Sequence, residues 1–417
     1  MNIAVIGLGK LGLPLAALLA SCGNKVRGFD VLESVRNSVK TRTLESNEPG
    51  LSELLDATMS RLEIVDEISV AVQNAEIVFL IVPTPSLPSG HFSNQFLLDA
   101  IDAIGRFLNL NQRVVVNVVS TVMPGACEGP IKERLETATG AKIGSQLGLC
   151  YNPEFIALGS VLQDMQYPDM HLIGQSSNWA GEVVEKALKT IIKRDVPTKR
   201  MNLKEAELVK IAVNNYVTMK ISYANMLMQT SILLSGIDID IVTSAIGLDS
   251  RIGAKYLKAA APYGGPCFPR DTRALGALYK DLGLDDSLSV ASEKINNFHA
   301  QFIAGKVAES LASGDKIGIA GLSYKTGTSV IDDSPGLSIA KELHEKGFKL
   351  QAWDDEGVIL NRDVSAYFDA IVESASELVA SSDFLLITRP LKNPNNFASL
   401  LKEAQKPFLD LWRNISY

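Results

Sequence analysis

The chain opens with Asn2-Ile3-Ala4-Val5-Ile6-Gly7-Leu8-Gly9-Lys10-Leu11-Gly12, and this stretch decides the fold of its first half. An apolar run of strand length leads through the spacing GxGxxG into an Ala/Leu-rich helical pattern that extends to about Ser21. The first glycine permits a tight turn, the second lets a pyrophosphate approach the backbone, and the third lets helix and strand pack closely. The first N–H groups of the helix attract phosphate. We therefore expect Gly7, Gly9, Lys10, Leu11 and Gly12 to bind a dinucleotide.

A second short strand pattern, Lys25 to Asp30, ends in an acidic residue. Asp30 lies at the sequence distance from the glycine turn that suits a hydrogen bond to the adenosine ribose. A free ribose hydroxyl rather than a phosphate at that position favours NAD over NADP as the cofactor. The alternative is a glycine turn in some other α/β protein.

Further apolar runs follow at α/β spacing, over residues 76–82 and 113–119 and from Leu147 to the proline turn at Pro153. Such runs are typical of parallel strands that are buried on both faces. Thr84 and Thr121 lie in the turns after the first two, at the sheet edge where ligands bind. They are expected to face the cofactor or a catalytic water, with turn capping as the alternative. Glu154, after the third run and Pro153, is a candidate base, although exposed loop glutamates are commoner.

The longest helical pattern runs from Asn202 to about Leu234, with Glu205 and Glu207 near its start. We expect it to connect domains and to offer a dimer face. Lys210 and Asn214 are four residues apart, so their side chains point the same way. A cation and an amide on one side of an apolar helix suit an anionic oxygen. An ordinary solvated pair is the alternative.

The segment Tyr263-Gly264-Gly265-Pro266-Cys267-Phe268-Pro269-Arg270-Asp271 holds two glycines and two prolines, which predict a turn-rich loop. Its thiol, Cys267, is followed closely by Arg270 and Asp271. A thiol is a strong nucleophile as the thiolate, which nearby cations favour. Cys267 is thus a candidate nucleophile, and an inert, small hydrophobic residue is the alternative.

After this loop, residues 272–282 and 288–311 are expected to be helical, and then the α/β pattern returns. Strands are expected at 316–322, 349–353, 384–388 and 407–411, with a helix at 336–346. The fold class is therefore α/β, with two Rossmann-like, doubly wound parallel-sheet domains joined by a long central helix and a helical middle domain. We place the domains at residues 1–200, 201–300 and 301–417.

Composition narrows the function classes. A formal net charge of −7 over 417 residues argues against a broad nucleic-acid surface. The four cysteines lack CxxC or zinc spacing, which predicts reduced thiols and a cytoplasmic protein. The four histidines are dispersed, so no metal site is expected. The apolar runs are far shorter than a membrane span, so no membrane association is expected.

Taken together, the motifs resemble the UDP-glucose/GDP-mannose dehydrogenase family over nearly the full length. The matching segments are the glycine turn with Asp30, Glu48-Pro49-Gly50-Leu51, Val82-Pro83-Thr84-Pro85, Ser120-Thr121-Val122, Asn152-Pro153-Glu154-Phe155, Ala206-Glu207-Leu208-Val209-Lys210 with Asn214, Ser250-Arg251-Ile252-Gly253, Gly264-Gly265, Cys267-Phe268-Pro269-Arg270-Asp271 and Gly321-Leu322-Ser323-Tyr324-Lys325. Their order and spacing, rather than any one of them, make the resemblance specific.

The resemblance implies NAD-dependent oxidation of the C6 hydroxyl of a nucleotide-linked hexose, expected to be a UDP-sugar, to a carboxylate for polysaccharide or glycoside synthesis. By this resemblance, Cys267 would capture the aldehyde as a thiohemiacetal that becomes a thioester. Lys210 and Asn214 would stabilise the oxyanion, while Asp271 would orient Lys210 and help to activate water. Thr121 would hold that water, and Glu154 would serve in acid–base work during hydrolysis.

The resemblance also implies how substrate binds and how chains assemble. The expected substrate-binding residues are Phe155, Lys210, Arg251, Tyr256, Lys258, Gly264, Gly265 and Lys325. Of these, Arg251 would reach into the site of a neighbouring subunit, which makes a homodimer the smallest expected assembly. The nucleotide sugar is the expected partner molecule.

The sequence departs from the family pattern at several positions. Leu158 stands where the family usually has a second Glu, four residues after Glu154. Met170 stands where the family usually has an Arg. In the loop that carries the Cys267 thiol, Pro266 stands where the family has a small residue, and Pro262, just before this thiol loop, stands where the family has a glycine. An Arg that contacts the cofactor is replaced by Asp332, a charge reversal that another cation such as Arg389 could compensate. These departures bear on substrate and cofactor affinity, because the candidate catalytic residues are retained.

Two other functions fit part of the sequence. A two-electron alcohol dehydrogenase acting on a nucleotide sugar or nucleoside would stop at the aldehyde, and would release one NADH per substrate instead of two. A redox-inactive nucleotide-sugar binding protein is favoured only by Leu158 and Asp332, and would bind NAD weakly or not at all.

Overall fold

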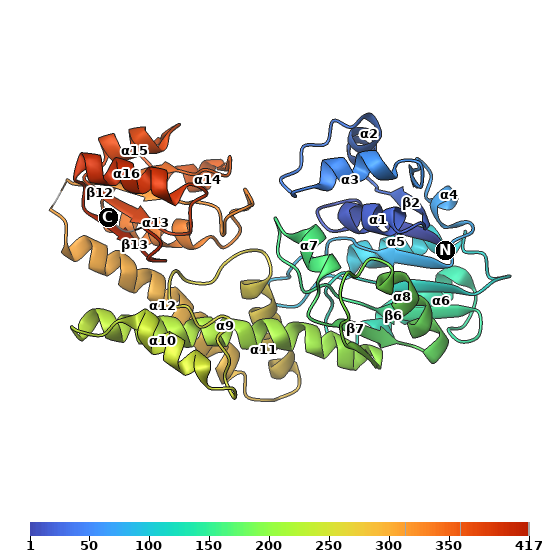
Figure 1. Ribbon diagram of the computed structural model, residues 1–417. Helices are drawn as coiled ribbons and strands as arrows, with labels where there is room; N and C mark the ends of the chain where they lie inside the picture. The colour runs from blue at the N-terminus through green and yellow to red at the C-terminus, as the bar shows by residue number, and fades with distance from the viewer. Residues whose placement is uncertain (313, 359, 416–417) are drawn as a thin grey trace. The chain divides into compact units, whose positions relative to one another are not determined.

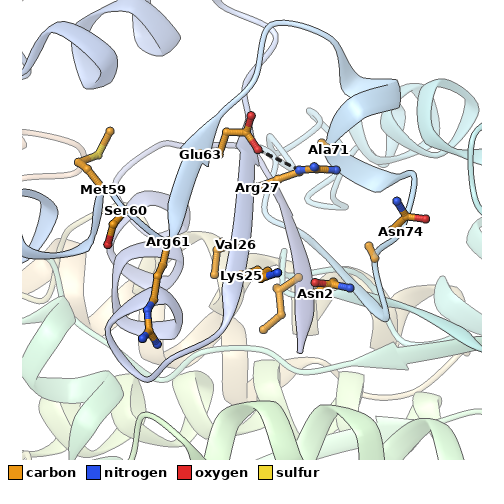
Figure 2. Close-up of a pocket in the computed structure, with 12 residues that line it drawn as sticks. Asn2, Lys25, Val26, Arg27, Met59, Ser60, Arg61, Glu63, Ala71 and Asn74 are labelled. Atoms are coloured by element: carbon orange, nitrogen blue, oxygen red, sulfur yellow. Dashed lines mark hydrogen bonds and ion pairs between the residues drawn. The ribbon is translucent and has the colours of Figure 1, made fainter.

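The computed structural model in Figure 1 describes residues 1–312, 314–358 and 360–415. The chain divides into two compact units, Met1–Ala212 and Val213–Tyr417. Helix α9 (Leu203–Leu233) passes through the boundary without a break, which confirms the long helix predicted from the sequence. The division into three domains at residues 200 and 300 stays a prediction. In the part of the chain that the structure describes, every helix is too short or too polar to span a membrane.

The first unit is built on an eight-stranded sheet in the order β3-β2-β1-β4-β5-β6-β7-β8. Its strands are β1 (Asn2–Ile6), β2 (Lys25–Phe29), β3 (Leu62–Ile64), β4 (Ile77–Leu80), β5 (Val114–Val118), β6 (Leu147–Tyr151), β7 (His171–Gln175) and β8 (Thr198–Met201). From β3 to β6 the neighbours are parallel, whereas β7 runs antiparallel to β6. β5 is buried along its whole length, as expected for a parallel strand covered on both faces.

Helices cover both faces of this sheet, as Figure 1 shows. They are α1 (Gly12–Ser21), α2 (Glu33–Thr41), α3 (Leu51–Thr58), α4 (Ile68–Val72), α5 (Gln95–Gly105), η1 (Cys127–Ile131), α6 (Lys132–Thr139), α7 (Val161–Gln166) and α8 (Asn178–Lys189). On one face Val5 belongs to the same core as Leu15 of α1. On the other face Ile6 belongs to the core that contains Ile101 of α5. The doubly wound arrangement predicted from the sequence is therefore confirmed.

The turn between β1 and α1 depends on two of its glycines. Gly7 has a φ of 97°, in the left-handed region that favours glycine. A Cβ atom on Gly12 would lie 1.9 Å from the carbonyl oxygen of Gly7, so only glycine lets α1 start this close to the strand. A Cβ atom on Gly9, by contrast, would meet nothing within 4 Å. Gly7 and Gly12 are thus needed by the fold, whereas the space beside Gly9 is open.

The second unit contains a five-stranded parallel sheet in the order β11-β10-β9-β12-β13. Its strands are β9 (Lys316–Ala320), β10 (Lys349–Trp353), β11 (Ala370–Ile371), β12 (Phe384–Ile387) and β13 (Phe408–Asp410). The helices after α9 are α10 (Ile239–Leu248), α11 (Phe268–Asp281), α12 (Ser287–Glu309), α13 (Pro335–Glu345), α14 (Arg362–Ser365), α15 (Ala375–Ser381) and α16 (Pro394–Ala404). The second parallel sheet and the helical region before it are as predicted.

The turn after β9 repeats the turn after β1. Gly321 has a φ of 99°, and its N–H donates to the carbonyl of Trp353 at the end of β10. The next N–H, that of Leu322, donates to Asp354 at 2.5 Å. In the first unit the N–H of Leu8 donates in the same way to Asp30, at 2.7 Å. Each parallel sheet therefore carries a glycine turn whose backbone is held by an acid after the neighbouring strand.

The two glycines Gly9 and Gly12 offer a matched test of the first turn. We expect Gly12→Ala to lower the free energy of unfolding by about 2 kcal/mol or more, because the new methyl group collides with the carbonyl of Gly7. Gly9→Ala should stay within about 0.5 kcal/mol of the wild type, since the space is open. Urea unfolding of the three proteins measures both values. Equal stability of the two variants would contradict this account of the turn.

Candidate active site

The first glycine turn and Asp30 form a cradle for a dinucleotide. The half-buried Asp30 carboxylate accepts hydrogen bonds from the N–H groups of Leu8 at 2.7 Å and Leu32 at 2.9 Å. A carboxylate has about four lone-pair positions, so these bonds orient it and leave acceptors for ribose hydroxyls. The open space at Gly9 admits a pyrophosphate beside the first N–H groups of α1. These residues therefore fit NAD, while Lys10 and Leu11 complete the same turn.

Hydroxyl groups connect the turns after β4 and β5. Thr84 is buried, and its Oγ1 donates to the carbonyl of Thr121 at 2.7 Å. Ser120 accepts from the N–H of Val82 and donates to the carbonyl of the same residue. This is the turn-capping role that the sequence left open for Thr84. The predicted contacts of Thr84 and Thr121 with cofactor or water stay predictions.

Glu154, Phe155 and Lys210 form one cluster within the first unit. Lys210 is only 6% exposed, and its Nζ donates to the carbonyl of Glu154 at 2.7 Å. The same ammonium group lies 4.7 Å from the centroid of the Phe155 ring, a cation–π distance. Burial raises the pKa of Glu154 from 4.5 to about 7, against the lowering effect of the positive charge of Lys210. A carboxyl group that titrates near neutrality can both accept and donate a proton.

The thiol loop differs from the prediction, because helix α11 begins inside it. The helix starts at Phe268, so the loop ends at Cys267, which is the N-cap residue. Pro269 does not break the helix, since a proline in the first turn lacks only an N–H that has no partner there. The exposed sulfur atom of Cys267 thereby lies at the end of a helix where the dipole favours negative charge.

Asp271, Asn214 and Arg270 form a second cluster, within the second unit. The Asp271 side chain is fully buried in the first turn of α11. It accepts hydrogen bonds from Nδ2 of Asn214 at 2.6 Å and from Nε of Arg270 at 3.0 Å. Asn214 is itself buried and lies on α9, four residues after Lys210. One helix therefore carries a member of each cluster.

The two glycines of the thiol loop are required by a close contact within the second unit. The N–H of Gly265 donates to the carbonyl of Asp332 at 2.9 Å. A Cβ atom on Gly265 would lie 2.5 Å from the ring of Tyr324, and one on Gly264 would lie 2.1 Å from the carbonyl of Asp333. This contact explains both glycines without a ligand, so their predicted contact with substrate stays a prediction.

Other residues predicted to bind substrate lie at more exposed positions. The side chain of Arg251 is 86% exposed and pairs with Asp249 at 2.6 Å. Tyr256 is half exposed and meets the ring of Phe268 edge-on, at 6.1 Å between centroids. Lys258 is exposed, whereas Lys325 is half-buried in the segment after β9. Their roles stay predictions.

Arg389 does not provide the compensating cation considered for Asp332. It is buried in the second unit, and its Nη2 donates to Asp354 at 2.9 Å and to Asp355 at 2.5 Å. These two carboxylates neutralise the guanidinium within the fold, so it is not offered to a phosphate.

The four thiols differ in their exposure to solvent. Cys127 and Cys150 are buried, and burial raises the pKa of each, to about 12 for Cys150. Cys22 and Cys267 are exposed. A buried thiol of high pKa is a poor nucleophile, so the exposure pattern favours Cys267 or Cys22. Only Cys267 has a buried carboxylate and a cation in the following turn.

Comparisons with known proteins give one family. A sequence model of the NAD binding domain of the UDP-glucose/GDP-mannose dehydrogenase family matches residues 1–192, and the central-domain model of that family matches residues 204–298. A UDP-glucose 6-dehydrogenase of Bacillus subtilis is 32% identical over 88% of this chain and 80% of its own. One from Haloferax volcanii is 29% identical over 93% of this chain and 90% of its own.

A solved structure agrees with these matches. The UDP-glucose dehydrogenase of Pyrobaculum islandicum superposes with a TM-score of 0.85 at 29% identity, covering 98% of this chain and 97% of that one. The similarity therefore extends over both units and includes the C-terminal sheet.

The raised pKa of Glu154 gives a prediction about stability. Between pH 4.5 and 7 the native state binds more protons at this residue than the unfolded state, so its contribution to stability falls as the pH rises through that range. Glu154→Gln removes the titration. We expect the melting temperature of Glu154→Gln, relative to that of the wild type, to increase between pH 5 and pH 8. Scanning calorimetry checks this, and a constant or decreasing difference would contradict the raised pKa.

Proposed function

This chain belongs to the UDP-glucose/GDP-mannose dehydrogenase family, and we propose that it oxidises the C6 hydroxyl of a UDP-linked hexose to a carboxylate. The coarser assignment, an NAD-dependent nucleotide-sugar dehydrogenase, follows from the family and its relatives. We propose two finer points: that the nucleotide of the substrate is UDP, and that the oxidation removes four electrons. The many relatives named UDP-glucose 6-dehydrogenase favour UDP.

One observation carries the proposal. The exposed thiol of Cys267 lies at the amino end of α11, one turn before a buried Asp271 that Asn214 holds at 2.6 Å. A nucleophile of this kind has no use in a reaction that stops at an alcohol-to-aldehyde conversion. It serves a second oxidation, because a covalent adduct converts an aldehyde into a species that can lose hydride.

The proposed reaction has three steps in which the chain's own residues act. The C6 hydroxyl first loses a proton and C6 loses a hydride, which gives the aldehyde. The sulfur of Cys267 then adds to the carbonyl carbon, and the resulting thiohemiacetal loses a second hydride to become a thioester. Water finally attacks the thioester, the C–S bond breaks, and the carboxylate and the thiol are released. Two molecules of NAD, bound one after the other by the Gly7–Gly12 turn and Asp30, would each accept one of the two hydrides.

The other side chains of the proposed mechanism have separate tasks. Lys210 and Asn214, which point the same way on α9, stabilise the oxyanion of the covalent adducts. Asp271 orients the amide of Asn214, and it helps to activate water. Glu154, with its pKa near 7, takes the proton from the hydrolytic water that Thr121 helps to hold. Each task matches the charge or hydrogen-bonding capacity that the side chain has in the structure.

We assign the nucleotide sugar to a further set of residues. Positive charge from lysine and arginine suits a diphosphate, and aromatic rings suit the sugar faces. The proposed contacts are Phe155, Lys210, Arg251, Tyr256, Lys258, Gly264, Gly265 and Lys325. Arg251 is exposed in the turn that follows α10, which suits a contact with the site of a neighbouring chain.

A homodimer is part of the proposal. Large apolar residues on α9 are exposed at helical spacing, including Tyr216, Tyr223 and Met226. On α10, Ile241 is 68% exposed and Leu248 is 84% exposed. Large apolar residues exposed together along a helix are typical of a protein–protein interface. A second copy of this chain is the partner that would also bring Arg251 to a neighbouring site.

The covalent route gives the main test of the proposed function. We expect wild-type enzyme to form two NADH per UDP-hexose consumed, because one chain performs both oxidations. Cys267→Ser should lower turnover to the acid by about 10³-fold or more, while NAD binding stays within a few fold. NADH absorbance and product analysis over UDP-, GDP- and dTDP-hexoses measure these quantities and identify the base.

Cys22→Ser is the matched control, since Cys22 is the other exposed thiol and plays no part in the mechanism. It should keep wild-type turnover. Full activity of Cys267→Ser would refute the covalent step, and a ratio of one NADH per substrate would refute the four-electron oxidation.

The dimer gives a second test. We expect Ile241→Asp to reduce the mass of the particle in solution from two chains to one, because a charge replaces an exposed apolar contact. Light scattering after size exclusion measures the mass. Phe107→Asp, the same change at an exposed apolar residue of the first unit, should leave the mass unchanged. A wild-type protein that elutes as a monomer would contradict the proposed assembly.

A further inference from the structure

Glu207 is a fully buried carboxylate on the second turn of α9. Its Oε2 accepts from the N–H of Gly125 at 2.5 Å, and its Oε1 accepts from the N–H of Cys127 at 2.7 Å. A buried carboxylate is costly unless its lone pairs are used, and here both oxygens bind backbone N–H groups. Burial still raises the pKa of Glu207, although these hydrogen bonds lower it.

The two N–H groups come from one short segment. Gly125 belongs to the turn that follows β5 and contains Thr121, and Cys127 begins η1. A single hydrogen bond would allow the helix to rotate about that contact. Two bonds to backbone atoms two residues apart determine both the direction and the register of α9 against that turn.

The same helix turn leads directly to Lys210. Residues 207 and 210 are neighbours on one helix face, since side chains three residues apart lie close together. Lys210 donates to the carbonyl of Glu154 at 2.7 Å. In the turn after β5 that Glu207 binds, the carbonyl of Thr121 accepts a hydrogen bond from Thr84. Hydrogen bonds at three points, joined by the turn after β5 and by one turn of α9, thus connect Thr84, Glu207 and Glu154.

We propose that Glu207 is a positioning residue that sets Lys210 and Glu154 relative to Thr121. It does not touch the reacting atoms, because both of its oxygens bind the backbone of the turn and η1. The inference rests on the proposed function, which gives Lys210, Glu154 and Thr121 their tasks. It adds that the rotation of α9 about its axis, rather than the presence of Lys210 alone, determines the rate.

Glu207→Gln tests the inference. Glutamine keeps the size of the side chain but presents an NH₂ group to one backbone N–H, so one of the two bonds is lost. We expect kcat to fall by about 10- to 100-fold, as displacement of a catalytic group by about 1 Å does. KM for the UDP-hexose and the Kd of NAD should stay within about threefold.

The pH profile of kcat separates positioning from mere stability. Lys210 is the charged group that lowers the pKa of Glu154, so a loosened Lys210 lets that pKa rise. The acidic limb of the profile should therefore move to higher pH in Glu207→Gln. A residue with a purely structural role would lower the melting temperature and leave this limb in place.

Two further variants complete the experiment. Glu205→Gln is the matched control, because Glu205 is exposed on the same helix and its carboxylate accepts from the N–H of Asn202 within the helix start. It should behave as wild type. Glu207→Asp keeps the buried charge, so it covers the case in which Glu207→Gln does not fold. Its shorter side chain cannot reach both N–H groups, and kcat should fall by about fivefold or more with KM unchanged.

A folded Glu207 variant whose kcat and acidic limb match those of Glu205→Gln would overturn the inference. Its failure is distinguishable from failure of the proposed function. An inactive wild type would refute the function, whereas an active wild type with unaffected Glu207 variants would refute only the positioning role.

Discussion

Buried carboxylates hold the helix that carries the candidate catalytic groups. Glu207 in the first unit binds two backbone N–H groups, and Asp271 in the second binds the amide of Asn214. Because an unpaired buried carboxylate costs several kcal/mol, each is stable in one arrangement only. Successive residues of an α-helix turn by about 100°, so these contacts also determine where Lys210 and Asn214 point. The proposed chemistry depends on that rotation.

The same kind of glycine turn follows the first strand of both sheets, but its acid has a different role in each. In both, a glycine with positive φ follows the first strand, and an acid after the next strand holds the turn. Asp30 keeps lone pairs for a ribose, whereas Asp354 is neutralised by the buried Arg389. The glycine turn alone therefore does not determine a dinucleotide site. A dinucleotide site also needs an acid whose lone pairs stay available, and of these two turns only the first has one.

Two of the departures from the family pattern, Leu158 and Asp332, fall on positions that the fold uses. Leu158 packs against the core of the first unit, so its apolar side chain has a structural place. Asp332 contributes its main-chain carbonyl to the N–H of Gly265, a contact that does not require a particular side chain. Neither change touches the hydrogen bonds of Asp271, Asn214 or Glu207. The groups to which we assign the reaction are therefore unaltered by these two changes.

The sequence by itself indicated most of the strands, the glycine turns and the long helix, because these depend on local periodicity and on the conformational freedom of glycine. It did not indicate the short strands β3, β7, β8 and β11. It also marked Cys267, Lys210, Asn214 and Glu154 as candidates through residue type and spacing. It missed that α11 begins at Phe268 and what Glu207 binds. Both depend on partners distant in sequence or on the packing around a helix start. Only the tertiary structure decides which acids are buried, and therefore which carboxylates hold the fold and which stay available for chemistry.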